Sequence, residues 1–350
     1  MQRRVTLAEV ARRAGVSQTT ASFVLSGRGD EMRISQQVRG RVQQAVRDTG
    51  YRPNVVSRSL RTGTTQTIGF VSDTVATTPF AGHLIWGALD AARESDHLLL
   101  IAETEGDPEL EKEMIEAMRD RGVDGIVLAS MYTRWAAIPK GLLDGPSVLL
   151  NALPLKRCAI ASVIPDEIEA GRTAARALLE AGHTEGIYVV GAGPRLTQVP
   201  KGVVAAAERL TGIKEVLDAA NVELAGGVSL RDWQPIGGYE ATRKFLQAKP
   251  EPKALICFND RLSVGAYNAL EDSGRKVGQD VSVVSFDDEP VASWLRPQLT
   301  SIAIPHYELG RKAIELLLDG SSEPLLEGQV HRMPMPLRQR ESIVGPKAIL

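Results

Sequence analysis

Small hydroxyl and amide side chains cluster shortly after the N-terminus, where Ser17, Gln18, Thr19 and Thr20 follow the tripeptide Ala-Gly-Val. Ser17 is the kind of residue that caps a helix through its side-chain oxygen, so the next three residues would crowd the first turn of that helix. A helix-turn-helix places its base-contacting side chains at this end of its second helix, in the major groove of DNA. The cluster therefore predicts recognition of DNA bases.

A second group of polar residues lies near the ends of predicted strands in the rest of the chain. In open α/β sheets, ligands bind beyond the carboxyl ends of the strands. Carboxylates and amides would bond hydroxyl groups there, and an aromatic side chain would stack on a ring face, so the group predicts a polyhydroxyl ligand. The polar members are Asp73, Arg134, Asn151, Asn259 and Asp287, and the stacking candidates are Trp233 and Phe80. The neighbouring Asp260 and Asp288 are expected instead to cap the helices that follow.

Three short helices would position the first group. Thr6 and Glu9 form the Thr-x-x-Glu pattern of a capping box, and Gly15 supplies the turn before the second helix. Ser35 begins a third helix, which Gly50 ends. The apolar residues of this third helix recur at helical spacing, and they are Val38, Val42, Ala45 and Val46.

Charge is divided unevenly along the chain. Residues 1–63 hold twelve arginines and four acidic residues, a formal charge of +8, whereas the remainder carries −10, which gives the net −2. A basic head on an acidic body suits a module that meets phosphate. The N-terminal residues have no apolar signal-peptide core, no stretch reaches about 18 apolar residues, and Cys158 and Cys257 lack metal-ligand spacing. These patterns predict a cytoplasmic protein with no membrane partner and no metal or cofactor.

A short helix is predicted between the head and the rest of the chain. Asn54 would cap it, and Gly63 would end it. A helix of about two turns is unstable alone in water, so this hinge is expected to form only against DNA or a partner.

From Gln66 onward, short apolar runs alternate with amphipathic stretches, which is typical of parallel sheets covered by helices. Roughly 280 residues suit two such units better than one. The predicted fold class is therefore α/β, with an all-α helix-turn-helix head and a two-lobed body. The predicted strands are Thr67–Val71, Leu98–Ala102, Gly125–Ala129, Ser147–Leu150, Gly186–Val190, Ala254–Phe258, Val281–Phe286 and Leu299–Ile304. The predicted helices lie near 81–95, 108–121, 167–181, 203–220, 237–248, 261–274 and 306–319.

The order of these motifs resembles one known family. The segments TLAEVARRAGVS, ISQQVRGRV, GYRPN, SRSL and IGF, with FNDR and SFDD further on, are similar to the lactose/galactose repressor (LacI/GalR) family of bacterial regulators over nearly the whole chain. The resemblance implies that Gln18, Thr19 and Phe23 contact bases. It also implies that Leu60 wedges into the minor groove at the centre of a palindromic site. The residues expected at the DNA are Thr6, Ser17, Gln18, Thr19, Thr20, Ser22, Phe23, Tyr51, Asn54, Ser57 and Leu60.

The same resemblance implies a body similar to periplasmic sugar-binding proteins, with two lobes that the chain crosses three times. The expected effector-binding residues are Asp73, Phe80, Arg134, Asn151, Arg209, Trp233, Asn259 and Asp287. The expected boundaries are 1–52 for the head, 53–65 for the hinge, 66–341 for the body and 342–350 for a tail. Within the body, the first lobe is expected at 66–163 plus 295–328 and the second at 164–294 plus 329–341.

Four features depart from the family pattern. Phe23 stands where a polar residue is common, so it either contacts a thymine methyl group or packs within the head. The segments 27–33 and 195–208 are longer than usual, and Asn151 takes the place of an acid. The identity of the effector therefore does not carry over from the family.

The favoured hypothesis is a homodimeric repressor of carbohydrate-related genes that a small sugar-like effector releases from a palindromic operator. A dimer is expected because the C-terminal segment lacks the leucine heptads of a tetramerising helix. A co-repressor with a non-sugar chemistry is physically just as allowed. The basic head argues against a solute-binding protein, and none of the five histidines lies in a nucleophile or metal motif of an enzyme. The helix near 81–95 belongs either to the dimer interface or to the lobe core.

Overall fold

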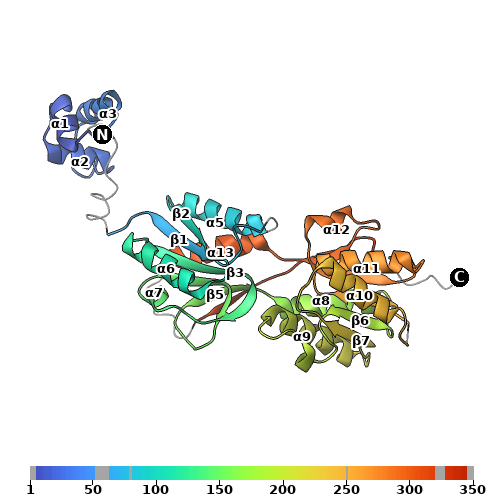
Figure 1. Cartoon of the computed structure of the whole chain (residues 1–350). Helices are drawn as coiled ribbons and strands as arrows, with labels where there is room; N and C mark the ends of the chain where they lie inside the picture. Colours follow the sequence, from blue (N-terminus) through green and yellow to red (C-terminus); the bar gives the residue numbers. More distant parts are fainter. Residues whose placement is uncertain (1–4, 52–62, 79–80, 250, 320–327, 345–350) are drawn as a thin grey trace. The chain divides into compact units, whose positions relative to one another are not determined.

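The computed structural model describes residues 5–51, 63–78, 81–249, 251–319 and 328–344. They belong to two compact units, Met1–Thr65 and Gln66–Leu350 (Figure 1). The predicted hinge residues Asn54, Ser57 and Leu60 and the stacking candidate Phe80 lie outside the described residues. None of the helices in the described ranges combines the length and the apolar character that a membrane span needs.

The first unit is a bundle of three helices, α1 (Leu7–Ala14), α2 (Gln18–Leu25) and α3 (Gln36–Thr49). The predicted caps of these three helices are confirmed. The side chains of Thr6, Ser17 and Ser35 accept the backbone N–H three residues on, and the Thr6–Glu9 capping box is complete. Gly15 and Gly50 take the left-handed backbone conformation that ends α1 and α3. The small core consists of Val10, Ala11, Ala14, Ala21, Val42 and Ala45.

The second unit contains two six-stranded sheets, one in each lobe. The first has the strand order β11-β5-β4-β3-β1-β2, and all its paired strands are parallel. The second has the order β12-β10-β9-β8-β6-β7, and only β12 is antiparallel to its neighbour. The strands of the first sheet are β1 (Thr67–Ser72), β2 (Leu98–Glu103), β3 (Gly125–Ala136), β4 (Ser147–Pro154), β5 (Ala161–Pro165) and β11 (Val330–Met333). Those of the second are β6 (Ile187–Gly191), β7 (Gly226–Ser229), β8 (Ala254–Cys257), β9 (Ser282–Asp287), β10 (Thr300–Ala303) and β12 (Leu337–Arg338).

Helices cover both sheets, as the alternating pattern predicts. The first lobe carries α5 (Gly82–Glu94), α6 (Pro108–Asp120), α7 (Lys140–Leu143) and α13 (His306–Leu318). The second carries α8 (Glu167–Glu180), the short 3-10 helix η2 (Leu196–Gln198), α9 (Val204–Ala219), α10 (Pro235–Phe245), α11 (Asp260–Asp272) and α12 (Pro290–Trp294). The largest core lies in the second lobe, where Phe258 and Phe286 are fully buried.

The chain crosses between the lobes three times, but two of the predicted lobe boundaries are wrong. Strand β10 pairs with β9, so it belongs to the second lobe although residues 295–304 were assigned to the first. Strand β11 pairs with β5 and belongs to the first lobe, although 329–333 were assigned to the second. The predicted boundaries fail because a short apolar run identifies a strand without identifying the sheet that it joins.

Four strands escape the sequence pattern. Strand β7 reads Gly-Gly-Val-Ser, β12 is two residues long, and β5 and β11 run together at one edge of the first sheet. Glycine in β7 and the short length of β12 remove the apolar signal that identifies a strand. Strand β3 is longer than predicted, so Arg134 lies on a strand and not in the loop after it.

Helix α5 is largely lobe core. Leu84, Ala88 and Ala92 are buried, and α5 packs along α13 (Figure 1). The approach is close: a Cβ atom at Gly87 would lie 1.9 Å from the carbonyl oxygen of Tyr307. The opposite face of α5 leaves Trp86 55 % exposed.

Substituting Gly87 tests this packing. Gly87→Ala is expected to lower the free energy of unfolding by about 1–3 kcal/mol, because the new methyl group must push α5 and α13 apart. Gly82→Ala in the same helix meets no atom within 4 Å and should change stability by less than about 0.5 kcal/mol. Urea unfolding measures both, and equal midpoints for the two variants would contradict the close approach.

Candidate functional site

The N-terminal turn of α2 presents two unengaged polar side chains. Ser17 Oγ accepts the backbone N–H of Thr20 at 3.0 Å and lies 2.8 Å from Thr20 Oγ1, so these two hydroxyls serve the cap. Gln18 and Thr19 are exposed, and their side chains make no hydrogen bond within the described residues. They are therefore free to bond an external partner at a helix N-terminus.

Charged residues of the segment after α2 form ion pairs within the head. Arg28 forms an ion pair with Glu31 at 2.7 Å, and Arg39 of α3 pairs with Asp30 at 2.5 Å. The Arg28 guanidinium also lies 5.3 Å from the ring centroid of half-buried Phe23. Phe23 therefore packs within the head in part, and the long segment 27–33 is tied to the bundle. Thr6 is engaged in its capping box, and Tyr51 packs against the bundle core.

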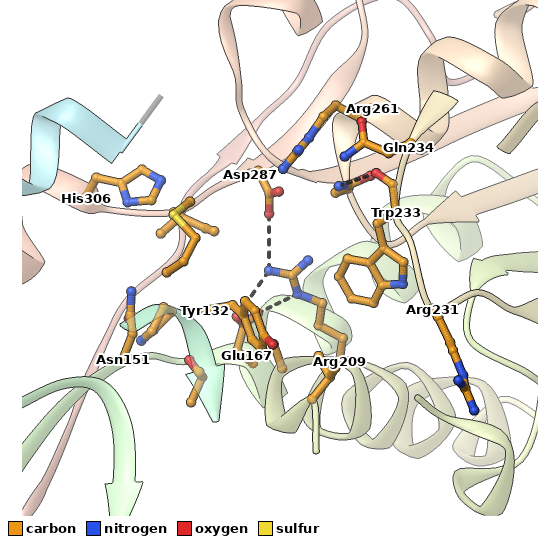
Figure 2. A pocket seen from close by; sticks show the side chains of 17 residues that line it. Tyr132, Asn151, Glu167, Arg209, Arg231, Trp233, Gln234, Arg261, Asp287 and His306 are labelled. Carbon is orange, nitrogen blue, oxygen red and sulfur yellow. Dashed lines mark hydrogen bonds and ion pairs between the residues drawn. The ribbon is translucent and has the colours of Figure 1, made fainter. Parts of the chain in front are cut away.

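A cavity of about 260 Å³ lies between the two lobes of the second unit (Figure 2). Five of the predicted effector residues line it, and they are Asn151, Arg209, Trp233, Asn259 and Asp287. The other lining residues are Met131, Tyr132, Thr133, Pro165, Glu167, Val203, Ala205, Arg231, Gln234, Arg261, Ile304 and His306. The cavity thus gathers side chains from elements that are far apart in the sequence.

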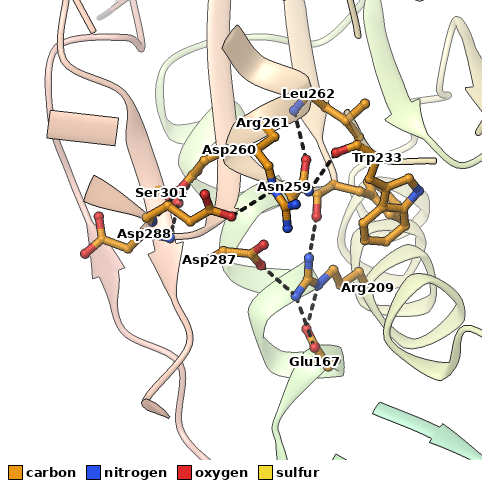
Figure 3. A network of polar contacts seen from close by, with 12 residues as sticks. Glu167, Arg209, Trp233, Asn259, Asp260, Arg261, Leu262, Asp287, Asp288 and Ser301 are labelled. Atoms are coloured by element: carbon orange, nitrogen blue, oxygen red, sulfur yellow. Dashed lines mark hydrogen bonds and ion pairs between the residues drawn. The ribbon is translucent and has the colours of Figure 1, made fainter. Parts of the chain in front are cut away.

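Arg209 of α9 is the central charge of this cavity. Its Nε and Nη2 atoms donate to Glu167 at 2.6 and 3.1 Å, and Nη2 also donates to Asp287 at 3.2 Å (Figure 3). Its Nη1 donates to the backbone carbonyl of Phe258, and the guanidinium lies 4.5 Å from the ring centroid of Phe286. Burial alone would lower the pKa of Arg209, but the two carboxylates outweigh it and raise that pKa. Arg209 is held rigidly as a cation.

Asn259 has two roles. Its Oδ1 accepts the backbone N–H of Leu262 at 2.8 Å and caps α11, and its Nδ2 donates to the Trp233 carbonyl at 3.2 Å. The prediction that Asp260 caps this helix is therefore wrong. Buried Asp260 instead accepts from Ser301 Oγ at 2.7 Å and from the backbone N–H of Glu289 at 2.6 Å (Figure 3).

Asp288 caps no helix either, because its carboxylate pairs with Arg340 at 2.7 Å. Asn and Asp compete for the same capping position, and only the backbone path decides which residue occupies it. The preceding Asp287 ends β9 with a positive φ of 101° and reaches the cavity.

Two predicted effector residues form an ion pair with each other and are not among the residues that line the cavity. Asp73 follows β1, and its Oδ1 accepts the N–H groups of Thr74 at 2.6 Å and Met131 at 2.9 Å. Arg134 lies 3.6 Å from Asp73 and donates to Ser130 Oγ at 3.0 Å. Burial raises the pKa of Asp73, and the two N–H groups and Arg134 oppose that rise. Neither residue belongs to the lining of the cavity.

Sequence reasoning missed several lining residues. Glu167 follows β5, a strand that the pattern did not identify, so its position at a sheet edge went unnoticed. His306 begins α13 directly after a lobe crossing, and only the three-dimensional path brings it to the cavity. Within the described ranges, no three His, Cys, Asp or Glu side chains lie together in a way that would hold a metal ion.

Removing the central cation should be costly. Arg209→Met is expected to destabilise the second unit by about 3–5 kcal/mol, because it leaves the buried Glu167 carboxylate unpaired. The double variant Glu167→Met/Arg209→Met should recover part of that loss, since the uncompensated charge is gone. Urea unfolding of the single and double variants measures the coupling, and additive losses would argue against it.

His306 should make stability depend on pH. Burial lowers the pKa of its imidazole, with Asp287 opposing and His83 adding to the decrease. As pH falls below about 6.5, the unfolded chain binds the proton before the folded one does, so stability is full above that pH and is lost below it. His306→Gln is expected to flatten the fall in the urea midpoint between about pH 6.5 and 5. Parallel profiles for variant and wild type would assign the acid sensitivity to other groups.

Comparison with known proteins identifies the family. Residues 6–54 match the model of bacterial regulatory proteins of the lacI family, and residues 175–343 match a periplasmic binding protein-like domain. The ribose operon repressor of Escherichia coli K12 is 30 % identical over 341 residues, which cover 96 % of this chain and 99 % of that protein.

Two solved structures share the architecture. The lac repressor dimer bound to operator and the anti-inducer ONPF has a TM-score of 0.79 at 25 % identity, covering 98 % of this chain and all of that one. A complex of the transcriptional regulator CelR with cellobiose has a TM-score of 0.66 at 29 % identity, covering 97 % of this chain and all of that one. With its three-helix head and its two parallel-sheet lobes around a polar cavity, this chain belongs to the lacI family of bacterial regulatory proteins.

Proposed function

We propose that this chain is a ligand-responsive transcriptional repressor of carbohydrate-related genes that works in the cytoplasm and is not an enzyme. A homodimer would bind a palindromic DNA operator through its two copies of α2 and would lose affinity when a small sugar-like effector occupies the interlobe cavity. The observation that carries the proposal is the exposed pair Gln18 and Thr19, unengaged at the N-terminus of α2 in a strongly basic segment. Amide and hydroxyl groups at that end of a recognition helix can bond base edges in the major groove.

The cavity chemistry supports a sugar-like effector. Trp233 offers an aromatic face, and Asn259, Arg209 and Asp287 offer hydrogen-bonding groups along one wall. This combination suits a ring that carries hydroxyl groups. A relative named as a ribose operon repressor and a neighbour solved with cellobiose are consistent with that chemistry.

The direction of the ligand response follows from differential affinity. A ligand weakens DNA binding only if it binds the DNA-free arrangement of the protein more tightly. The lac repressor neighbour was solved on its operator together with an anti-inducer, so occupancy of a ligand and DNA binding are compatible in that protein. A co-repressor with a non-sugar chemistry is therefore the second candidate for this chain.

An exposed apolar surface of the first lobe supports the proposed homodimer. Strand β2 is at the edge of its sheet, and Leu98, Leu100 and Ile101 are 71 %, 40 % and 42 % exposed. An exposed apolar edge strand favours pairing with another copy of the chain. Trp86 on α5 is a further exposed apolar side chain of this lobe.

Selection of bound DNA from a random duplex library, at near-physiological salt, tests the proposal directly. A folded dimer should enrich a palindrome with a flexible central step. Gln18→Ala should weaken or alter the preference at one position of each half-site, by about 1–3 kcal/mol per base pair. Gln43→Ala, at an exposed position of α3, is the matched control and should keep the wild-type consensus.

If the folded wild-type dimer enriches no sequence, with or without sugars present, the proposed DNA-binding role is wrong. If Gln18→Ala and Gln43→Ala select the same consensus as wild type, the recognition residues lie elsewhere in the head.

A further inference from the structure

The segment that joins α2 to α3 is a folded turn and not an open loop. It begins at the carboxyl end of α2, where the backbone N–H of Arg28 donates to the Phe23 carbonyl at 3.0 Å. Two further backbone hydrogen bonds close the turn, from Met32 to Arg28 at 3.0 Å and from Ile34 to Gly29 at 2.8 Å. The side chains of this turn are therefore held in place next to α2.

Two of the four acidic residues of the basic head lie side by side in this turn, and each binds an arginine. Glu31 accepts from Nε and Nη2 of Arg28, each at 2.7 Å, and Asp30 accepts from Nη2 of Arg39 at 2.5 Å. Arg39 also donates to the Ile34 carbonyl at 2.7 Å, and its side chain is 28 % exposed. The Arg28 side chain is 49 % exposed. Arg39 therefore holds the turn on α3, whereas Arg28 is open to an external partner.

Arg28 lies beside the face of α2 that is proposed to contact bases. Thr19 and Phe23 are four residues apart in this helix, so their side chains lie on the same face. The Arg28 guanidinium lies 5.3 Å from the centroid of the Phe23 ring, which places the cation next to that face. Half or more of the hydrogen bonds between proteins and DNA go to phosphate and sugar groups. A cation at this position would therefore meet phosphate when α2 enters the major groove.

A carboxylate and a phosphate compete for the same guanidinium, because both match the planar fork of arginine. Glu31 already occupies the Nε and Nη2 fork of Arg28 and balances its charge. An exposed ion pair of this kind contributes little stability in water. A DNA phosphate can therefore displace Glu31 at a small cost in free energy.

We propose that Glu31 masks Arg28 in the DNA-free protein and that a DNA phosphate displaces Glu31 when the head binds. The masking contact lowers the affinity for DNA of any sequence, because phosphates carry no sequence information. The inference rests on the proposed DNA-binding role of α2 and adds to it a competitor within the same head.

Removing the competitor should raise DNA affinity. Full-length Glu31→Gln should bind the selected palindrome and a scrambled duplex about two- to fivefold more tightly per head at near-physiological salt. Asp30→Asn is the matched control, since it removes the same charge one residue away but leaves Arg39 bound to the Ile34 carbonyl. It should change both affinities by a smaller factor. Fluorescence anisotropy measures both variants, and equal gains would mean a general charge effect and contradict masking.

Arg28→Gln separates competition for the guanidinium from direct repulsion of DNA. It should weaken binding to both duplexes and lower the slope of log affinity against log salt by about 0.9 per head, because one phosphate contact is lost. In the Arg28→Gln background, Glu31→Gln should add no more than Asp30→Asn does, since no guanidinium is left to unmask. A full gain in that background would assign the effect to repulsion between Glu31 and DNA, and the proposal would be wrong.

The selected consensus should be the same for all these variants, because a phosphate contact does not read bases. A changed consensus would mean that Arg28 contacts a base, which also overturns masking. A wild type that binds neither duplex rejects this proposal together with the proposed function. A wild type that enriches a palindrome and binds it as tightly as Glu31→Gln does rejects masking alone.

Discussion

The buried guanidinium of Arg209 is the interaction on which the cavity depends. It joins the start of α8 through Glu167, the end of β9 through Asp287 and the residue after β8 through the Phe258 carbonyl. A cation removed from water requires such partners, because burial without them would cost several kcal/mol. The second-lobe wall of the cavity is consequently built around one charge that three separate elements must satisfy.

The close packing of α8 against α9 positions the Arg209 side chain. A Cβ atom at Gly171 of α8 would lie 2.1 Å from the backbone oxygen of Arg209, so only glycine allows α8 and α9 to approach this closely. A similar approach brings α5 onto α13 at Gly87 and Gly310. Glycines thus set the positions of the two helices that deliver Arg209 and His306, one to each side of the cavity.

Several contacts between described residues join the two lobes of the second unit. Arg332 of β11 pairs with Glu208 of α9 at 2.7 Å, and the backbones of Arg134 and Val203 form a bridge. Leu153 and Ile164 of the first lobe bury a small apolar cluster with Val204 of the second. A molecule that contacts both walls would act on the same boundary as these contacts. It would shift the balance between lobe arrangements if it binds one of them more tightly than the other.

The sequence by itself determined the features that depend on local chemistry. Helix caps at Thr6, Ser17 and Ser35, the turn at Gly15 and the alternation of apolar strands with amphipathic helices are set by residues a few positions apart, so each could be predicted. Asn259 and Asp287 reached the cavity because the ends of neighbouring parallel strands converge on one edge of a sheet, whereas Arg209 lies on helix α9 and was expected only from the family resemblance. Tertiary structure alone decided the rest. Contacts between residues far apart in the chain decide that Asp73 pairs with Arg134 and that β10 joins the second sheet. Such contacts also bring Glu167, Thr133 and His306 to one cavity. Local patterns carry no information about such pairings, because they arise only when the helices and sheets pack together.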